Sequence, residues 1–278
     1  MTIFHEICNR QLLYWVRNQK AILRSLSDNN NLFVKEMNSG RIIVLVSLFF
    51  ITTAIFVFAQ EKRTDDNRFI SYTVDPQKLN VKLYWKDDSN HNFGSIKNLK
   101  LWLEKSEKNL VFAMNGGMYK TDGSPLGLFI QEHQTKSPLN TSNGNGNFYL
   151  KPNGIFYLTT DNIPWISGTT DFVNNGKIKY ATQSGPMLVI NGQIHSAFKK
   201  GSANLNIRNG VGILPGNKIV FAMSKNEISL YDFADYFKTM GCKNALYLDG
   251  FVSRAYLPEK GWIQVDGNFG VIIGITKS

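Results

Sequence analysis

Asp249 has the position in the sequence that most favours chemistry. It follows the apolar residues 245–248 and precedes Gly250, with Ser253 and Arg254 a few positions later. A carboxylate at the end of a buried strand, ahead of residues that bend the chain, is a common place for chemistry in mixed α/β proteins. An Asx-turn is the alternative, because Asp249 can accept hydrogen bonds from backbone N–H groups of its own loop. The segment alone leaves both interpretations open.

Three further segments also place glycine and polar residues at the end of an apolar run. Two successive glycines allow a ligand to approach the backbone closely and can expose amide N–H groups to an anion. A guanidinium at the start of a strand can pair with phosphate or carboxylate. Each segment alone is more typical of a turn than of a site. The segments are Asn115-Gly116-Gly117-Met118-Tyr119, Gln183-Ser184-Gly185-Pro186 and Arg208-Asn209-Gly210.

Taken together and in this order, the four segments resemble the phosphodiester glycosidase domain family. The family pattern has Asn-Gly-Gly or Asn-Ala-Gly after a strand, then Pro-x-Gly-Leu and Gln-x-Gly-Pro. An Arg that opens a strand follows, and then Leu-Asp-Gly-Gly with a Ser nearby. The resemblance extends over residues 68–276. This chain carries the pattern at residues 115–117, 125–128 and 183–186, at Arg208 and at residues 248–250.

The resemblance implies hydrolysis of a sugar-1-phosphodiester, and the family includes an enzyme that removes N-acetylglucosamine from such a bond. The phosphoryl group leaves as an anion with a low pKa, so a strong general acid is less necessary than for an ordinary glycoside. Stabilising the leaving phosphate therefore becomes the main task of the site.

The resemblance also implies a role for each matching residue. Asp249 would activate water or stabilise the oxocarbenium-like centre. Arg208 and the backbone amides of Gly116 and Gly117 would stabilise the leaving phosphate, and Asn115 would hold oxygens of the sugar or phosphate. The catalytic residues are thus expected to be Asp249, Arg208 and Asn115. The substrate-binding residues are expected to be Gly116, Gly117, Gln183, Ser184, Gly185, Gly250 and Ser253.

Phe251 and Val252 depart from the family pattern, which usually has glycine after Asp-Gly. A side chain at these positions would narrow a sugar pocket or occupy backbone space that a phosphate needs. The departure favours a second hypothesis, a non-catalytic module on the same fold that binds glycans or interacts with the cell envelope. Release of free sugar from an N-acetylglucosamine-1-phosphodiester distinguishes the two hypotheses.

Other titratable residues are weaker candidates. Asp122 is a good turn former that lies close enough in sequence to Asn115 to be a second acid, and Glu132 and Asp266 are weaker still. No calcium-loop motif is present, and the histidines lack metal-ligand spacing. The sequence therefore predicts no metal and no cofactor. The histidines considered are His91, His133 and His195.

Residues 42–60 carry no charge and are long enough to span a bilayer. They follow Arg41 and end in small residues near Ala59, as a signal peptide does. Translation from Met37 would give a conventional signal peptide, and residues 1–36 would then precede the true start. The alternative is a type II membrane anchor with a basic cytoplasmic tail, and a buried core helix is a third interpretation. Both favoured interpretations place the following domain on the periplasmic or extracellular face, anchored to the membrane if the segment is uncleaved.

The chain therefore divides into four parts: an N-terminal tail (1–41), a signal-peptide core or transmembrane anchor (42–59), a linker (60–67) and a phosphodiester glycosidase-like domain (68–278). The exported part is large enough to fold on its own core. It holds one thiol, Cys242, so it forms no internal disulfide. We expect this thiol to be buried as a small apolar group.

The net charge of the chain is +10, and removal of residues 1–59, which hold six Lys or Arg and three Asp or Glu, leaves +7. The basic residues are scattered along the chain. This pattern favours solubility or mild attraction to anionic glycans and argues against nucleic acid as a partner. The expected partner is a glycan or sugar phosphodiester substrate. The composition, 43% hydrophobic and 19% charged, is that of a folded protein.

Two helices are predicted among many short strands. Residues 95–109 form an amphipathic pattern behind a Ser cap, and residues 230–240 follow Ser229 and end at Gly241. The pattern indicates an α+β fold: a single domain with a largely antiparallel or mixed β-sheet and a few packed helices, preceded by an N-terminal apolar segment. Alternating or apolar runs predict strands at 69–74, 81–85, 110–114, 126–130, 148–150, 155–158, 187–190, 193–194, 211–214, 219–223, 246–248 and 271–275.

Overall fold

The computed structural model describes Leu48 and residues 66–277. The predicted tail, nearly all of the apolar segment at 42–59 and most of the linker lie outside the described residues, so the export of the domain stays a prediction. The structural unit that contains residues 66–277 is described here by itself. No helix within the described residues has the length and apolar character that crossing a membrane requires.

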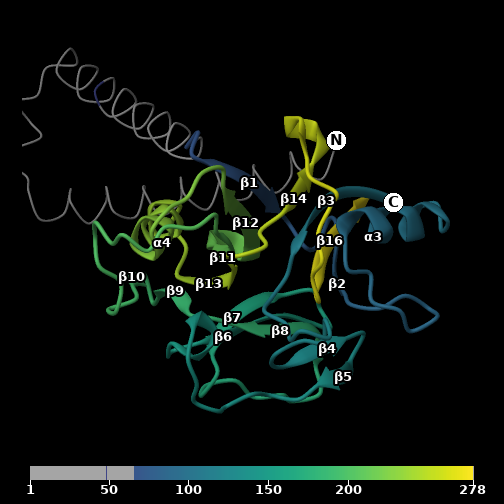
Figure 1. Cartoon of the computed structure of the whole chain (residues 1–278), viewed down its shortest axis with the longest axis horizontal. Coiled ribbons are helices and arrows are strands. Elements are labelled where there is room, and N and C mark those ends of the chain that lie inside the picture. Colours follow the sequence, from purple (N-terminus) through teal and green to yellow (C-terminus); the bar gives the residue numbers. More distant parts are fainter. Residues whose placement is uncertain (1–47, 49–65, 278) are drawn as a thin grey trace, which may run out of the picture. The chain divides into compact units, whose positions relative to one another are not determined.

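Three sheets form this unit, and every strand pairing in them is antiparallel (Figure 1). The six-stranded sheet has the order β1-β12-β11-β13-β9-β10. Its β13 strand is central and ends at Asp249, the predicted catalytic residue. The strands are β1 (Phe69–Val74), β12 (Lys218–Ser224), β11 (Asn209–Leu214), β13 (Asn244–Asp249), β9 (Met187–Ile190) and β10 (Gln193–Ile194).

The other two sheets have five strands each. The β3 sheet has the order β15-β14-β3-β16-β2, and the β8 sheet, in teal below the others in Figure 1, has the order β5-β4-β8-β6-β7. The β3 sheet contains β15 (Trp262–Ile263), β14 (Ala255–Leu257), β3 (Asn109–Asn115), β16 (Ile272–Lys277) and β2 (Asn80–Tyr84). The β8 sheet contains β5 (Gln134–Ser137), β4 (Phe129–Gln131), β8 (Ile178–Ser184), β6 (Gly154–Thr159) and β7 (Pro164–Gly168).

The main hydrophobic core lies where the three sheets meet. It includes Phe221 and Leu246 from the six-stranded sheet, Phe112 and Ile273 from the β3 sheet, and Phe156 from the β8 sheet, all of them buried. Burial of such side chains is the main favourable term in folding. Because one core serves all three sheets, the described residues fold as a single domain. The predicted α+β class with antiparallel pairing is confirmed.

Both predicted helices are present. Helix α3 (Ile96–Glu104) begins at Ser95, whose side chain accepts a hydrogen bond from the Asn98 N–H, and it buries Ile96, Leu99 and Leu103. It is shorter than the predicted 95–109 because Glu107 adopts a positive φ of 55°.

Helix α4 (Leu230–Thr239) begins at Ser229, whose Oγ accepts from the Asp232 N–H and donates to the Asp232 carboxylate. It ends before Gly241, which has a φ of 88°. Cys242, just beyond the helix, is buried as expected, and burial raises the pKa of its thiol to about 12.

One predicted strand is wrong, and several observed strands were not predicted. Residues 148–150 do not form a strand; Asn147–Tyr149 is a 3-10 helix, η1, whose Phe148 is buried. A run of three apolar residues is too short for its period to separate a strand from a turn. Strand β8 was missed because its last three residues, Thr182, Gln183 and Ser184, are polar although they are buried. The strands β5, β7, β14 and β15 were also missed, and the further 3-10 helices are η2 (Pro215–Asn217) and η3 (Pro258–Lys260).

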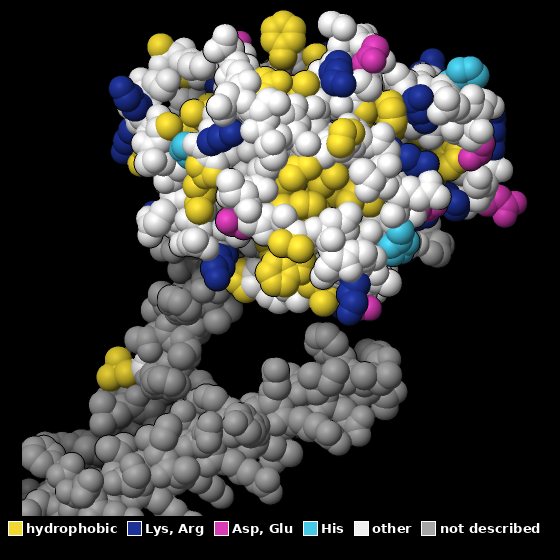
Figure 2. Space-filling model, turned by 90° about the horizontal axis from the view of Figure 1, so that it is seen from below, with side chains coloured by type: hydrophobic (Ala, Val, Ile, Leu, Met, Phe, Trp, Pro, Cys, Tyr) yellow, Lys and Arg dark blue, Asp and Glu magenta, His cyan; other side chains and the backbone are white. Residues whose placement is uncertain are grey.

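The surface charge agrees with the scattered basic residues of the sequence. On the face shown in Figure 2, Lys and Arg side chains of the described residues lie apart from one another, among Asp, Glu and uncharged side chains. A nucleic-acid interface normally has a clustered basic patch. This face therefore lacks the clustered basic patch of a nucleic-acid interface.

Candidate active site

Three polar residues from two sheets come together at one place. Asn115 is the last residue of β3, Asn209 is the first of β11, and Asp249 is the last of β13. Asn209 and Asp249 are Cα partners across the β11–β13 pair. The Asn209 side-chain nitrogen donates to the backbone oxygen of Asn115 at 2.9 Å and to its Oδ1 at 2.8 Å. Two of the three predicted catalytic residues, Asn115 and Asp249, are therefore neighbours in the folded chain, as expected.

The side chain of Asn115 has a fixed orientation. Its Oδ1 accepts from Asn209 Nδ2 and from the backbone N–H of Arg254, the latter at 3.0 Å. A flipped amide would turn its NH₂ group toward these two donors, so the hydrogen bonds define which atom is oxygen. Asn115 Nδ2 is buried and has no hydrogen-bond partner of ordinary geometry among the described residues. It lies close enough to the Asp249 carboxyl to favour the ionised form of that group.

Asp249 forms the Asx-turn and is also buried. Its Oδ1 accepts from the Gly250 N–H at 2.6 Å and from the Phe251 N–H at 3.1 Å, and the residue is 8% exposed. Burial raises the pKa of the Asp249 carboxyl, against the opposing effect of the two backbone N–H groups and the Asn115 side chain. The Asx-turn interpretation is confirmed, and both backbone N–H groups of the turn bond to Oδ1. The catalytic interpretation of Asp249 stays a prediction.

Asn209 is a site residue that the sequence prediction did not select. It is fully buried, and its Oδ1 has no hydrogen-bond partner among the described residues. Unpartnered buried polar atoms are rare in folded proteins and call for a specific explanation. Asn115 Nδ2 and Asn209 Oδ1 together offer one donor and one acceptor beside the Asp249 carboxyl. The sequence did place Asn209 at the start of a predicted strand, but the prediction selected the neighbouring Arg208 instead.

Arg208 lies close to the site but is engaged by the protein. It is 0% exposed, and its guanidinium donates to Ile228 O at 2.7 Å and to the Tyr247 hydroxyl at 2.9 Å. Two further hydrogen bonds go to Asn204, and no carboxylate pairs with it among residues 66–277. The cation is therefore buried without a countercharge, which is unusual unless an anion is to be bound nearby.

Tyr247 links Arg208 to the Asp249 turn. A Cβ atom added to Gly250 would lie 1.6 Å from the Tyr247 hydroxyl and 3.5 Å from Arg208 Nη1. Only glycine allows this approach of the turn to the buried cation. Burial raises the pKa of Tyr247 to about 12, so its hydroxyl stays protonated. The close contact with Tyr247 explains why a glycine follows Asp249.

The two glycines after Asn115 are required by packing. The Gly116 N–H donates to Val271 O at 2.8 Å, and a Cβ there would lie 2.7 Å from an Ile273 side-chain carbon. Gly117 has a φ of +150°, and a Cβ would lie 2.6 Å from the Thr182 hydroxyl. The expectation that the Gly116 amide stabilises a phosphate is therefore corrected, because a backbone carbonyl already occupies that donor.

Gln183 braces the loops around the site. Its Oε1 accepts from the backbone N–H groups of Leu128 and Asn140, both at 2.9 Å. Its Nε2 donates to Asn140 O at 2.6 Å and to Thr169 Oγ1 at 3.3 Å. With these contacts the carboxamide holds protein groups rather than projecting freely toward a ligand.

Ser184 and Gly185 continue this support. Ser184 Oγ donates to Leu248 O at 2.8 Å, one residue before Asp249. A Cβ on Gly185 would lie 2.5 Å from Asn153 Cβ, so the backbone packs closely there. These residues connect the β8 sheet to the strand that carries Asp249.

The end of the Asp249 loop is held in place by Ser253. Its Oγ lies within hydrogen-bond distance of Asp249 O at 3.1 Å and of Ile207 O at 3.2 Å. Val252 packs against a hydrophobic cluster, whereas Phe251 is 93% exposed. The Phe251 ring is therefore in solvent and does not pack over the buried Asn115 and Asp249 side chains.

The weaker candidates lie in other settings. Asp122 accepts from both the N–H and the hydroxyl of Ser124, which lower the pKa of its carboxyl, as in a surface turn. Glu132 pairs with Lys82 at 3.1 Å, and Asp266 pairs with Arg254 at 2.9 Å. The described residues contain no group of three His, Cys, Asp or Glu side chains placed to hold a metal.

Comparisons with known proteins agree on the family and the fold. The sequence model of the phosphodiester glycosidase family matches residues 108–269, which is more than half of the chain and includes all the site residues named above. The uncharacterised protein YigE of Escherichia coli (strain K12) is 39% identical over 188 residues, 67% of this chain and 73% of that protein. The zebrafish N-acetylglucosamine-1-phosphodiester alpha-N-acetylglucosaminidase catalytic domain, auto-inhibited by its pro-peptide, superposes with a TM-score of 0.52 at 14% identity. That alignment covers 77% of this chain and 85% of the zebrafish chain, and at such identity it shows a shared fold.

Proposed function

Because this chain belongs to the phosphodiester glycosidase family, we propose that it is a hydrolase that cleaves the bond between a sugar and the phosphate of a phosphodiester. N-acetylglucosamine is the sugar we propose. The observation that carries the proposal is a buried carboxyl, Asp249, beside two buried polar atoms without partners, Asn115 Nδ2 and Asn209 Oδ1. Buried groups with a perturbed pKa and unmet hydrogen-bonding capacity are typical of catalytic sites.

The proposed reaction replaces the phosphate on the anomeric carbon with water. The bond from the anomeric carbon to the phosphate oxygen breaks, and both its electrons leave with the phosphate monoester. Ionised Asp249 accepts a proton from the attacking water, whose oxygen forms the new bond to carbon. Burial raises the pKa of this carboxyl, so its ionised form is a stronger base than an ordinary Asp carboxylate. The products are the free sugar and the phosphate monoester.

The two unpartnered amide atoms would orient the sugar. Asn115 Nδ2 donates to a sugar oxygen, and Asn209 Oδ1 accepts from a hydroxyl or an N-acetyl N–H. Both amides are held by the contact between Asn209 Nδ2 and the Asn115 oxygens. Such pre-organised groups lower the barrier by positioning the reactants without rearranging during the reaction.

Arg208 would act on the leaving phosphate through the field of its charge. The guanidinium has no carboxylate partner among the described residues, and it lies behind Tyr247 and Gly250. In a buried setting an uncompensated positive charge attracts an anion over a longer distance than in water. The developing negative charge on the phosphate would be stabilised in this way.

The setting of the reaction is also a proposal. The uncharged segment at 42–59 and the basic residues before it support a domain that works outside the cytoplasm. The substrate would then be a glycan phosphodiester of the cell envelope or the extracellular space. The reaction as proposed uses no metal and no cofactor.

A non-catalytic glycan-binding module is the second candidate. It is favoured by the engagement of the Gly116 amide and the Arg208 guanidinium with protein acceptors, since both were expected to bind phosphate directly. The departure at Phe251 and Val252 points the same way. Such a module would bind the phosphodiester and leave it intact.

The deciding experiment incubates the purified full chain with an N-acetylglucosamine-1-phosphodiester and measures free N-acetylglucosamine. Hydrolysis is expected, and Asp249→Asn is expected to reduce it by a factor of about 10³ or more, since proton transfer and charge stabilisation are both lost. Binding of the substrate by the unmodified chain without release supports the module instead. Full activity of Asp249→Asn would remove Asp249 from the mechanism.

A further inference from the structure

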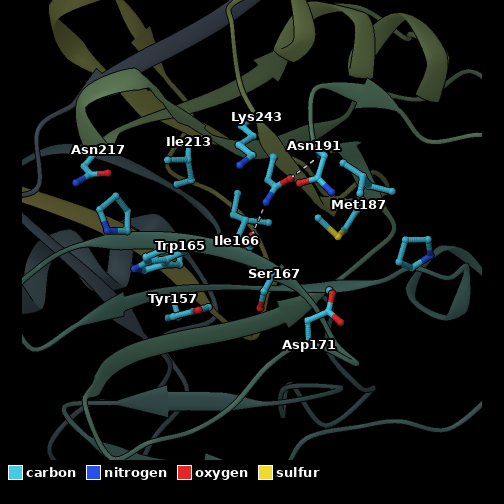
Figure 3. A pocket seen from close by; sticks show the side chains of 15 residues that line it. Tyr157, Trp165, Ile166, Ser167, Asp171, Met187, Asn191, Ile213, Asn217 and Lys243 are labelled. Carbon is cyan, nitrogen blue, oxygen red and sulfur yellow. Dashed lines mark hydrogen bonds between the residues drawn. The ribbon is translucent and has the colours of Figure 1, made fainter.

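A groove lies at the opposite end of β13 from Asp249. It has a volume of about 540 Å³ and is lined by β6 and the edge strand β7 on one side and by the ends of β9, β11 and β13 on the other (Figure 3). Asn244, at the start of β13, lines it, whereas Asp249 ends the same strand. At about 3.3 Å per residue the two ends are roughly 16 Å apart. None of Asn115, Asn209 and Asp249 lines the groove, so it is a separate site.

An aromatic pair forms one wall of this groove. Trp165 on β7 and Tyr157 on β6 are directly opposite each other in the antiparallel register, and Figure 3 shows their rings close together. Trp165, the second residue of the edge strand β7, is 53% exposed. Leaving half of a large aromatic side chain in water forgoes much of the free energy that its burial would provide. The ring is therefore presented to solvent rather than used for packing.

Polar side chains line the rest of the groove. Asn191, Asn217 and Lys243 face the aromatic wall from segments that connect strands of the six-stranded sheet, and Asp171 lies at one end (Figure 3). Ser167 Oγ is buried and has no hydrogen-bond partner of ordinary geometry among the described residues, although it lies close enough to the Tyr157 hydroxyl to oppose the rise that burial causes in the pKa of Tyr157. One cation and one anion are present, so the charges of this lining balance. The groove therefore offers a ligand an aromatic surface and hydrogen-bonding side chains, and its lining has no net charge.

The groove is also held rigid. Asn244 Oδ1 accepts from the Asn191 N–H at 2.9 Å, and its Nδ2 donates to Ile166 O at 2.9 Å, as the dashed lines in Figure 3 show. This side chain ties β7 to the β9–β10 turn across the groove floor. A preformed concave site loses less free energy on binding than one that must be ordered.

We propose that this groove binds an uncharged oligosaccharide, with one sugar ring stacked on Trp165 and its hydroxyls bonded to the surrounding amides. A pyranose presents a flat face of C–H groups and a rim of hydroxyls, which matches an aromatic wall with a polar rim. Balanced charge does not favour nucleic acid or an anionic lipid surface. The site binds the non-reacting part of a glycan, and its occupancy does not depend on the hydrolytic function proposed for Asp249.

The test measures binding without turnover. Tryptophan fluorescence and calorimetry follow the titration of the full chain carrying Asp249→Asn with N-acetylglucosamine tetramer and, separately, with glucose tetramer. We expect at least one of them to bind with a Kd of about 1 mM or tighter, as a single stacked site allows. Adding Trp165→Ala is expected to raise the Kd at least about 10-fold, and Trp165→Phe to restore most of the affinity.

Phe251→Ala is the matched control, because it removes another exposed aromatic ring near Asp249. It is expected to leave the Kd unchanged. A Kd that rises equally in Phe251→Ala places the saccharide at the Asp249 site and overturns the proposal, as does the absence of binding for both tetramers. A Kd that weakens strongly with added salt identifies a charged ligand and also overturns it. Unchanged hydrolysis of a small phosphodiester by Trp165→Ala would separate this groove from the proposed catalytic site.

Discussion

Asn209 pairs with Asp249 across β11 and β13, but the next residue of β11, Gly210, pairs with Tyr247. Leu248 is therefore the extra residue of a β-bulge directly before Asp249. Bulges bend a strand and re-aim the side chains beside them, and they are common next to active sites. The carbonyl of Leu248 is not left unpartnered, since Ser184 Oγ from the β8 sheet donates to it at 2.8 Å.

This arrangement predicts the effect of Ser184→Ala. Loss of the hydroxyl leaves Leu248 O without this donor, which costs about 1–3 kcal/mol in the free energy of unfolding. The displaced bulge should lower kcat by up to about 10²-fold, with a smaller change in KM, because Asp249 is misplaced while sugar contacts remain. Steady-state kinetics and urea unfolding measure both effects. Ser95→Ala is the control, as it removes the cap of α3 at a comparable cost of about 1 kcal/mol and should leave kcat unchanged.

Asp249→Asn should stabilise the protein at neutral pH. Burial raises the pKa of the folded carboxyl above its unfolded value. Between the two pKa values the folded state holds a proton that the unfolded state has released, so stability falls as the pH rises through that window. Above the window the ionised carboxylate destabilises the fold, whereas Asn carries no charge and its oxygen still accepts from Gly250 and Phe251.

The measurement for Asp249→Asn is urea unfolding of both proteins at pH 7 and again below pH 4. The difference in free energy of unfolding, variant minus wild type, should be more positive at pH 7. A difference that is larger at the acidic pH would show that the folded pKa is lowered instead. This outcome would remove the basis for treating Asp249 as an unusually strong base.

Asn209→Ala should reduce activity without touching Asp249. The Asn115 backbone oxygen loses its Asn209 donor, and Oδ1 keeps only the Arg254 N–H, so the amide of Asn115 is less firmly held. We expect kcat to fall by about 10²-fold and the free energy of unfolding by about 1–3 kcal/mol. Asn209→Asp should be worse, because it turns a carboxylate toward two acceptors near another buried acid. Wild-type kinetics in Asn209→Asp would exclude Asn209 from the site.

Arg208 and Arg254 should respond differently to the same change. Arg208→Met leaves the acceptors at Ile228, Tyr247 and Asn204 unpartnered in a buried place, which predicts a loss of at least about 3 kcal/mol.

Arg254→Met breaks a partly exposed ion pair with Asp266 and a hydrogen bond to Ser253 O, which predicts a loss of about 1 kcal/mol. Thermal unfolding of the two variants provides the comparison. Similar losses would mean that the buried hydrogen bonds of Arg208 contribute no more to stability than the exposed contacts of Arg254.

The sequence was sufficient for the strands that carry Asn115 and Asp249, but not for five other strands of the described residues. The hairpin at Asn191-Gly192 and the strand Phe69–Val74 were predicted with the observed bounds because their turn residues and alternation are local signals. Asp249 and Asn115 each end an apolar strand, and the order of the motifs indicated that these ends meet.

The remaining parts of the site depend on how the sheets pack. The contact of Asn209 with Asn115 joins residues 94 positions apart, and no local pattern reveals it. The burial of Arg208 and the four hydrogen bonds of Gln183 likewise arise only when loops and sheets assemble. The buried polar side chains at the end of β8 form hydrogen bonds with groups of the surrounding loops and strands. The composition of β8 therefore does not reveal its central position in the sheet.

The meeting of two sheets at Asn115 and Asp249 also sets when the protein can first act. β3 is made early in the chain, while Asp249 and the Arg254 N–H that holds Asn115 are added more than a hundred residues later. Contacts of such long sequence separation form slowly, and domains generally fold as units during synthesis. A growing chain therefore cannot bring Asn115 and Asp249 together until nearly its whole domain exists. The order of these residues delays assembly of the proposed site until synthesis of the domain is almost complete.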